Sequence, residues 1–246
     1  MQENNNFTPY PARLRSDGYA AITDGTSAPC FFGGNQGWWK PDRFAGNGCG
    51  AIAACDVLVY LSQHHSMSML VPQIKSLPAA FSDYRAFVDF FRLNYAYKKS
   101  KNLIGLPIPR LVACLNSYLS DVGCEGISFK NASGRLRNAE RIICTSLSAD
   151  LPVILKVGFN LETLGYKIYY PHTDVFCDHT AVKRMGWHYV VITEIAPDNG
   201  DCILTFSSWS GKGTMSLNEL RKNMGFKGGL IYIDSAMQLH ANGRQT

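Results

Sequence analysis

The chain has 246 residues, 46% of them hydrophobic, which is enough for one sizeable core or for two modest lobes that share a cleft. Its formal net charge of +5 comes from lysines and arginines spread along the whole chain, and this spread argues against a nucleic-acid partner. No run approaches the roughly 18 apolar residues of a membrane span, and the N-terminus lacks the apolar stretch of a secretory signal. We therefore expect no membrane contact and a cytoplasmic protein, or one exported by a route that needs no signal.

The eight cysteines give only weak support to a disulfide framework. Several lie inside apolar helical or strand patterns, as buried small hydrophobic residues do, and no CxxC pair exists. One conceivable metal cluster remains, made up of Cys177, Asp178, His179, His172 and Asp174. No second ligand pair has zinc-site spacing, so we predict no metal and no cofactor.

The first segment, residues 1–46, is expected to be an irregular arm packed on the body, and residues 47–246 to form a single domain. The stretch CFFGGNQGWWKPDRFAGNG is dense in glycine and aromatic residues, which is typical of a loop packed against a neighbouring surface. Its two tryptophans, Trp38 and Trp39, either line a substrate groove or fix the arm to the body. Packing is the simpler role.

Helices are predicted through the first half of the chain. The segment from Cys49 through GAIAACDVLVYLS is nearly all apolar and free of proline, which predicts a core helix buried on most sides. A second helix is expected in SDYRAFVDFFRLNYAY with Ser82 as its cap, and a third from Pro109 to Gly123. A fourth is expected over residues 137–149.

The second half of the chain is rich in β-formers bounded by turn residues. A short helix is expected in SLNELRKN, because Ser216 and Glu219 match a capping box. Helices followed by an antiparallel sheet predict an α+β fold with two lobes. The expected strands are residues 152–158, 167–171, 188–195, 202–209 and 230–234.

Cys49 stands at the start of the predicted core helix, between Gly48 and Gly50. Unpaired amides and the positive end of the helix dipole stabilise a thiolate there, so we expect the pKa of Cys49 to be lowered. The flanking glycines would let a substrate backbone approach closely. Cys49 is therefore the candidate nucleophile. We expect the opposite role, an inert buried thiol, for Cys55, Cys114, Cys144 and Cys202.

His188 precedes the predicted core strand YVVITEI, where its ring could act as a general base for Cys49. The strands on either side of the turn APDNGD are expected to form a hairpin, so His188 should face the end of the second strand. A group that orients the imidazole should lie among Ser207, Ser208 and Ser210. Trp209 could shield that hydrogen bond from water.

Four segments, in order along residues 47–220, resemble those of papain-like cysteine peptidases, and the bacterial C39-like peptidases are the most similar. They are NGCGAIAA, LPVILKVG, WHYVVITEI and ILTFSSWSGKGTMSLNEL. The separation 188 − 49 = 139 also falls within the roughly 130 to 150 residues expected between nucleophile and histidine. The resemblance implies a papain-like fold, in which a buried nucleophile helix packs against an antiparallel sheet, and a peptide or protein substrate.

The resemblance also suggests the remaining site residues. The third catalytic position falls on Ser207, where relatives carry asparagine or aspartate, and serine supplies no charge. The oxyanion glutamine of the family has its nearest counterpart in Gln36, 49 − 36 = 13 residues before the cysteine. Asn47, or the backbone amide of Cys49, could contribute to the same oxyanion hole. A substrate groove would be lined by Gly48, Trp38, Trp39, Trp187 and Trp209.

These residues predict a thiol hydrolase that works with a Cys49–His188 dyad or, with Ser207, a triad. The same site would serve an acyltransferase if an amine replaced water. A hypothesis from another class is a binding protein that keeps the fold without catalysis, for which the uncharged Ser207 is the main support. Substrate specificity and oligomeric state have no readable motif in the sequence.

Overall fold

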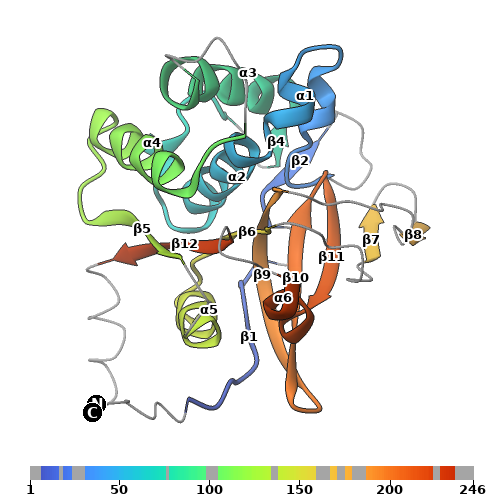
Figure 1. The fold of residues 1–246 in the computed structure, drawn as a ribbon. Coiled ribbons are helices and arrows are strands. Elements are labelled where there is room, and N and C mark those ends of the chain that lie inside the picture. The colour runs from blue at the N-terminus through green and yellow to red at the C-terminus, as the bar shows by residue number, and fades with distance from the viewer. Residues whose placement is uncertain are drawn as a thin grey trace.

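The structure of the chain is a computed structural model, which describes residues 7–16, 19–23, 31–75, 78–97, 105–133, 138–158, 167–170, 175–178, 187–223 and 228–235. Helices α1 to α4 gather on one side of a large antiparallel sheet, while α5 and α6 pack elsewhere on that sheet (Figure 1). The helices are α1 (Phe44–Asn47), α2 (Cys49–His64), α3 (Phe81–Phe91), α4 (Ile108–Asp121), α5 (Ala139–Ser148) and α6 (Leu217–Asn223). Shorter turns are η1 (Gln36–Trp39), η2 (Ser68–Leu70) and the π-helical η3 (Arg92–Ala96).

The large sheet runs in the order β5-β12-β6-β9-β10-β11-β7-β8, with β1 also paired to β9, and all of its described pairings are antiparallel. Its strands are β1 (Ala12–Arg13), β5 (Ile127–Ser133), β6 (Val153–Lys156), β7 (Lys167–Tyr170), β8 (Val175–Asp178), β9 (Tyr189–Asp198), β10 (Asp201–Ser208), β11 (Gly211–Ser216) and β12 (Gly229–Ser235). The mixed helical and antiparallel architecture confirms the predicted α+β class.

Helix α2 is the centre of the core. Every residue from Cys49 to Leu61 is buried, because β6 and β9 cover one side of the helix and α3 and α4 cover others. Strand β9 is covered on both faces, with α2 on one and α5 on the other, so all residues from Tyr189 to Thr193 are buried (Figure 1). A strand buried on both faces loses the alternation of polar and apolar residues, as the run YVVIT does.

The described part of the arm is tied into the body. Strand β1 pairs with β9, with Ala12 opposite Ile195. The Phe32 amide donates to the Ser210 carbonyl at 3.1 Å, and the Ser210 amide donates to the Gly34 carbonyl at 3.0 Å. These bonds fix the segment before α1 beside the end of β10. A small second sheet has the order β3-β2-β4, formed by β2 (Ala21–Thr23), β3 (Phe31–Phe32) and β4 (Ala79–Ala80).

The predicted helices are present, and two of the residues predicted to cap them can be compared with the structure. Ser82 is not the cap of α3: Ala80 occupies that position, and the Ser82 hydroxyl donates to Asp83 at 3.4 Å. At the start of α6, the Glu219 amide donates to the Ser216 hydroxyl at 3.0 Å, which confirms the serine half of the predicted capping box.

The five predicted strands correspond to β6, β7, β9, β10 and β12. Strands β5 and β11 were not predicted, because ISFKNAS and GKGTMS lack a dense run of β-branched and aromatic residues. Strand β11 exists because it pairs with β10 along its whole length, a tertiary effect that outweighs weak local propensity. Within the described ranges, no helix combines the length and apolar character needed to cross a membrane.

Gly48 links α1 to α2, and its close packing makes a prediction about stability. A Cβ atom at this position would lie 2.6 Å from the Phe44 ring and 2.7 Å from the Phe44 carbonyl oxygen. Gly48→Ala should therefore destabilise the fold by about 1–3 kcal/mol in urea unfolding, as overpacking does. Gly46→Ala is the matched control, since nothing lies within 4 Å of its Cβ position. Equal unfolding midpoints for the two variants would contradict the packing role of Gly48.

Candidate active site

Cys49 is the first residue of α2, and its side chain is 8% exposed. Its thiol donates to the carbonyl oxygen of Trp187 at 3.8 Å. Burial raises the pKa of Cys49, and the opposing stabilisation by the backbone amides of Tyr189 and Gly50 is smaller. The prediction that the helix start lowers the pKa of this thiol is therefore wrong for this conformation: the amides act in the expected direction, but desolvation is the larger effect.

His188 directly precedes β9 and is held from several directions. Its carbonyl oxygen accepts a hydrogen bond from the Val157 amide at 2.7 Å, which fixes the backbone beside β6. Its ring nitrogen Nε2 is hydrogen-bonded to the Ser208 hydroxyl at 2.6 Å, and the Trp209 ring stacks on it at 4.2 Å between centroids. Burial lowers the pKa of His188 to about 3, so the imidazole is neutral here.

Ser208, not Ser207, orients His188, and this corrects the third position predicted from the resemblance. The Ser207 hydroxyl instead donates to the Phe32 carbonyl at 2.8 Å. The reason is an irregularity in the β9–β10 pairing: Thr205 lies opposite Glu194, but Phe206 lies opposite Ile192.

This β-bulge changes which serine shares a face with the histidine. Without it, Ser207 would lie opposite Ile192, four residues from His188 and on the same face of β9. With it, Ser207 lies opposite Val191, and Ser208 takes the face of the imidazole. The sequence alone left Ser207, Ser208 and Ser210 open because it does not reveal the bulge.

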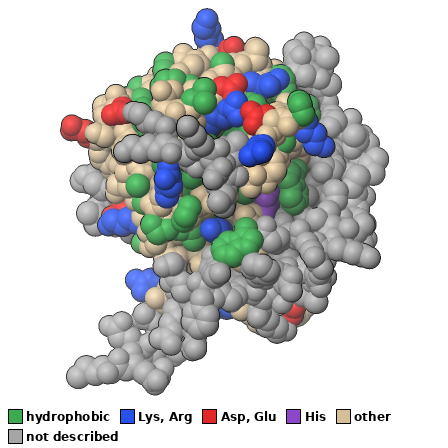
Figure 2. Space-filling view, turned by 45° about the horizontal axis from the view of Figure 1, so that its top comes forward, with side chains coloured by type: hydrophobic (Ala, Val, Ile, Leu, Met, Phe, Trp, Pro, Cys, Tyr) green, Lys and Arg blue, Asp and Glu red, His purple; other side chains and the backbone are tan. Residues whose placement is uncertain are grey.

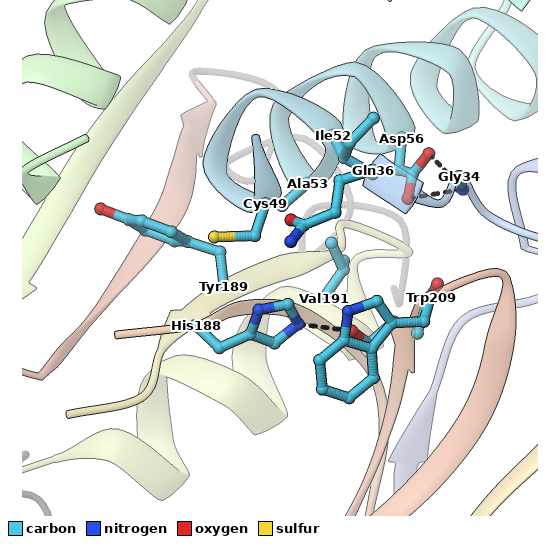
Figure 3. A pocket seen from close by; sticks show the side chains of 12 residues that line it. Gly34, Gln36, Cys49, Ile52, Ala53, Asp56, His188, Tyr189, Val191 and Trp209 are labelled. Carbon is cyan, nitrogen blue, oxygen red and sulfur yellow. Dashed lines mark hydrogen bonds between the residues drawn. The ribbon is translucent and has the colours of Figure 1, made fainter. Parts of the chain in front are cut away.

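Gln36 reaches the same pocket from η1. Its side-chain amide points toward the space between Cys49 and His188 (Figure 3). Its buried Oε1 atom finds no hydrogen-bond partner among the described residues. This oxygen therefore keeps acceptor capacity for a ligand beside Cys49, and the Nε2 of the same side chain is the group that could donate to one.

Asn47 points elsewhere. The side-chain Nδ2 of Asn47 donates to the Arg43 carbonyl at 3.3 Å, and the backbone carbonyl of Asn47 accepts from the Tyr97 hydroxyl at 2.8 Å. It is not among the residues that line the pocket. Of the two predicted oxyanion side chains, the structure therefore brings only Gln36 to Cys49.

Asp56 holds the segment that carries Gln36, and the sequence analysis missed it. Its carboxylate accepts the Gly34 amide at 2.9 and 3.1 Å and the Tyr84 hydroxyl at 2.6 Å. Gly33 approaches so closely that a Cβ there would lie 2.7 Å from an Asp56 carboxylate oxygen. The available signal was a single aspartate in an otherwise apolar run, two helical turns after Cys49 and on the same face of α2.

The pocket is small. Its volume is about 10 Å³, at the lower limit for one water molecule. In the space-filling view, a small area of histidine surface is visible in a recess bordered by hydrophobic side chains (Figure 2). The residues that line the pocket are Gly34, Gln36, Cys49, Ile52, Ala53, Asp56, His188, Tyr189, Val191, Ser207, Ser208 and Trp209.

The expected groove residues divide into two groups. Trp38 packs edge-on against Phe81, with 4.8 Å between ring centroids, and the indole of Trp39 donates to Asp89 at 2.8 Å, so both join the arm to the helices. Gly48 packs against the Phe44 ring, as shown above, and does not line the pocket. Trp209 lines the pocket, and Trp187 is 36% exposed beside Cys49.

No group of three or more metal-binding side chains occurs in the described ranges. The side chains of the conceivable cluster around Cys177 lie outside the described residues. The cysteines whose side chains are described are all free thiols: Cys49, Cys55, Cys114, Cys124, Cys144 and Cys202.

The buried carboxyl of Asp56 predicts a dependence of stability on pH. Burial raises the pKa of Asp56 to about 7 in the folded protein, above the ordinary value of 3.8. The folded state therefore keeps a proton that the unfolded state has lost, so this contribution to stability is full below about pH 4 and is lost as the pH rises through about 7. In urea unfolding, the wild type should lose stability over this range relative to Asp56→Asn, which has no carboxyl to titrate.

Tyr84→Phe is the control for the Asp56 prediction. It removes one hydrogen bond at a cost of about 1–3 kcal/mol and keeps the titrating carboxyl, so its pH slope should persist. Parallel stability curves for the wild type and Asp56→Asn from pH 4 to 7 would contradict the prediction.

The chain matches no model of a known protein family, and neither a curated protein nor a solved structure matches it. The geometry of the pocket and the sequence pattern are therefore the features that indicate a function.

Proposed function

We propose that the chain is a thiol acyl-hydrolase with a papain-like fold, similar to the C39-like peptidases, that acts on a peptide or related amide bond. One observation carries the proposal: Cys49, His188 and Gln36 come from three separate elements and converge on one pocket. A merely structural cysteine has no need of an oriented imidazole and an unsatisfied amide beside it.

The roles follow from the contacts of each group. The proposed reaction uses the tautomer in which the Nε2–H of His188 donates to the Ser208 hydroxyl, because this leaves a lone pair on Nδ1, on the side of the ring that faces Cys49 (Figure 3). In the proposed reaction, the Cys49 sulfur bonds to the carbonyl carbon while its proton passes to Nδ1. The amide of Gln36, with the amides at the start of α2, stabilises the oxyanion.

The acyl-enzyme is then resolved. His188 gives its proton to the leaving nitrogen, the bond between carbonyl carbon and nitrogen breaks, and the amine departs. Water then attacks the carbonyl carbon of the thioester while His188 takes a proton from it, the carbon–sulfur bond breaks, the carboxylic acid departs, and His188 returns the proton to the Cys49 sulfur. An amine in place of water would make the same site an acyltransferase, and no step needs a cofactor.

A second candidate is a binding protein that keeps the fold without catalysis. The observations that favour it are the small size of the pocket and the neutral state of both groups, since burial raises the pKa of Cys49 and lowers that of His188. Under the enzyme proposal, His188 takes the proton of the thiol as Cys49 attacks, so Cys49 reacts although its resting thiol is neutral. The two candidates therefore differ in the reactivity of Cys49 in solution.

Thiol labelling tests the proposal. With limiting iodoacetamide at pH 7, Cys49 should be modified ahead of Cys124, although Cys124 is the more exposed of the two in the structure. His188→Ala should slow labelling of Cys49 by about tenfold or more, in line with the roughly 10²- to 10⁴-fold contribution of general bases. Peptide mapping by mass spectrometry gives the rates. Labelling in the order of exposure, with Cys49 slower than Cys124, would support the binding protein instead.

Two neighbouring serines provide a matched pair of variants. Ser208→Ala removes the hydrogen-bond partner of His188 and should slow Cys49 labelling by about tenfold, because the imidazole loses its orientation. Ser207→Ala removes a bond to a backbone carbonyl and should cost about 0.5–1.5 kcal/mol of stability with little change in labelling. If Ser207→Ala slowed the labelling of Cys49 more than Ser208→Ala did, Ser207 rather than Ser208 would be the residue that orients His188.

A further inference from the structure

A second basic side chain lies beside Cys49. Lys156 ends strand β6 directly opposite Tyr189 of β9, and it is 7% exposed. Its ammonium lies 5.0 Å from the centre of the Trp187 ring and 5.3 Å from that of the Tyr189 ring. Its hydrogen bond is to the Leu106 carbonyl, at 3.4 Å.

This ammonium has no carboxylate partner among the described residues. One long hydrogen bond and two aromatic rings compensate only part of the cost of removing a charge from water. Burial accordingly lowers the pKa of Lys156, while the proximity of Cys49 acts in the opposite direction. A buried cation that finds no counter-ion among the described residues, next to a candidate nucleophile, is a typical arrangement of a functional group.

The groups that face Cys49 from each neighbouring element make Lys156 distinctive. His188 is neutral, as shown above, and burial raises the pKa values of Tyr97 and Tyr189, so both phenols are uncharged near neutral pH. Asp56 lies two turns further along α2, and its carboxylate accepts a hydrogen bond from the Gly34 amide of the N-terminal arm. Among these neighbours, Lys156 is the cation whose charge acts on the thiol.

We propose that Lys156 is a positioning residue for the proposed reaction: its ammonium stabilises the thiolate form of Cys49. The ammonium lies over the ring of Trp187, and the Trp187 carbonyl accepts the hydrogen bond of the Cys49 thiol. The inference rests on the proposed function. Lys156 keeps its own protons throughout, and the proton of the Cys49 thiol still passes to His188. The lysine thus supplies positive charge near the sulfur while the buried imidazole stays neutral and free to act as a base.

The pH profile of Cys49 labelling tests this role. Lys156→Met keeps the length and apolar stem of the side chain but removes the charge. The midpoint of the labelling rate against pH should rise by about one unit, so that labelling below the midpoint slows about tenfold, with an unchanged plateau at high pH. Lys156→Arg keeps the charge and should keep a midpoint close to the wild type.

Two further variants make the test specific. Lys212→Met is the matched control, because Lys212 also lies over an aromatic ring, at 5.9 Å from the centre of Phe32, but does not act on Cys49. Its midpoint should not move. Should Lys156→Met fail to fold, as judged by circular dichroism, Lys156→Gln carries the same expectation with a polar side chain.

The outcomes separate the inference from the proposed function. If Cys49 is labelled selectively and the midpoint does not rise in Lys156→Met or Lys156→Gln, the role of Lys156 is overturned and the thiol hydrolase proposal stands. A midpoint that also rises in Lys156→Arg overturns it too, since charge is then not the cause. If Cys49 of the wild type is not labelled selectively, the proposed function itself fails.

Discussion

The packing of α2 across strand β9 is the constraint on which the rest of the site depends. The contact is so close that a Cβ on Gly50 would lie 3.2 Å from the Tyr189 ring, which fixes the start of the helix against the strand. Cys49 directly precedes Gly50, and His188 directly precedes Tyr189, so both residues lie beside this contact. Because α2 is buried along its first thirteen residues, it has little freedom to shift, and the geometry of the pair is set by the core rather than by a loop.

The third participant, Gln36, is positioned by a different device. Gln36 lies 13 residues before Cys49, and the residues from Gln36 to Cys49 include η1 and α1 rather than a loose loop. The anchor is the Asp56 carboxylate, which holds the Gly34 amide from inside the same helix that begins with Cys49. One helix therefore positions both Cys49 and the segment that carries Gln36.

Much of this arrangement could be predicted from local pattern. The apolar run after Cys49 and the β-rich runs of the second half gave α2, β6, β9 and β10, because burial of such runs is nearly independent of the rest of the fold. What the pattern could not give was register. A bulge between Thr205 and Phe206 shifts the pairing by one residue, and that shift alone moves Ser208 into the place expected for Ser207.

The charge states of Cys49 and His188 could not be predicted from the sequence either, since the pKa of a side chain depends on how deeply the fold buries it. The start of α2 was expected to favour a thiolate, and its amides do so, yet desolvation of Cys49 outweighs them. The same burial removes the charge of His188, so the mutual stabilisation of thiolate and imidazolium is absent from the resting site. A cation that stays charged when buried could supply that stabilisation instead. Lysine, with its much higher intrinsic pKa, can remain charged where a histidine cannot, and that difference explains why β6 would place a lysine beside the sulfur.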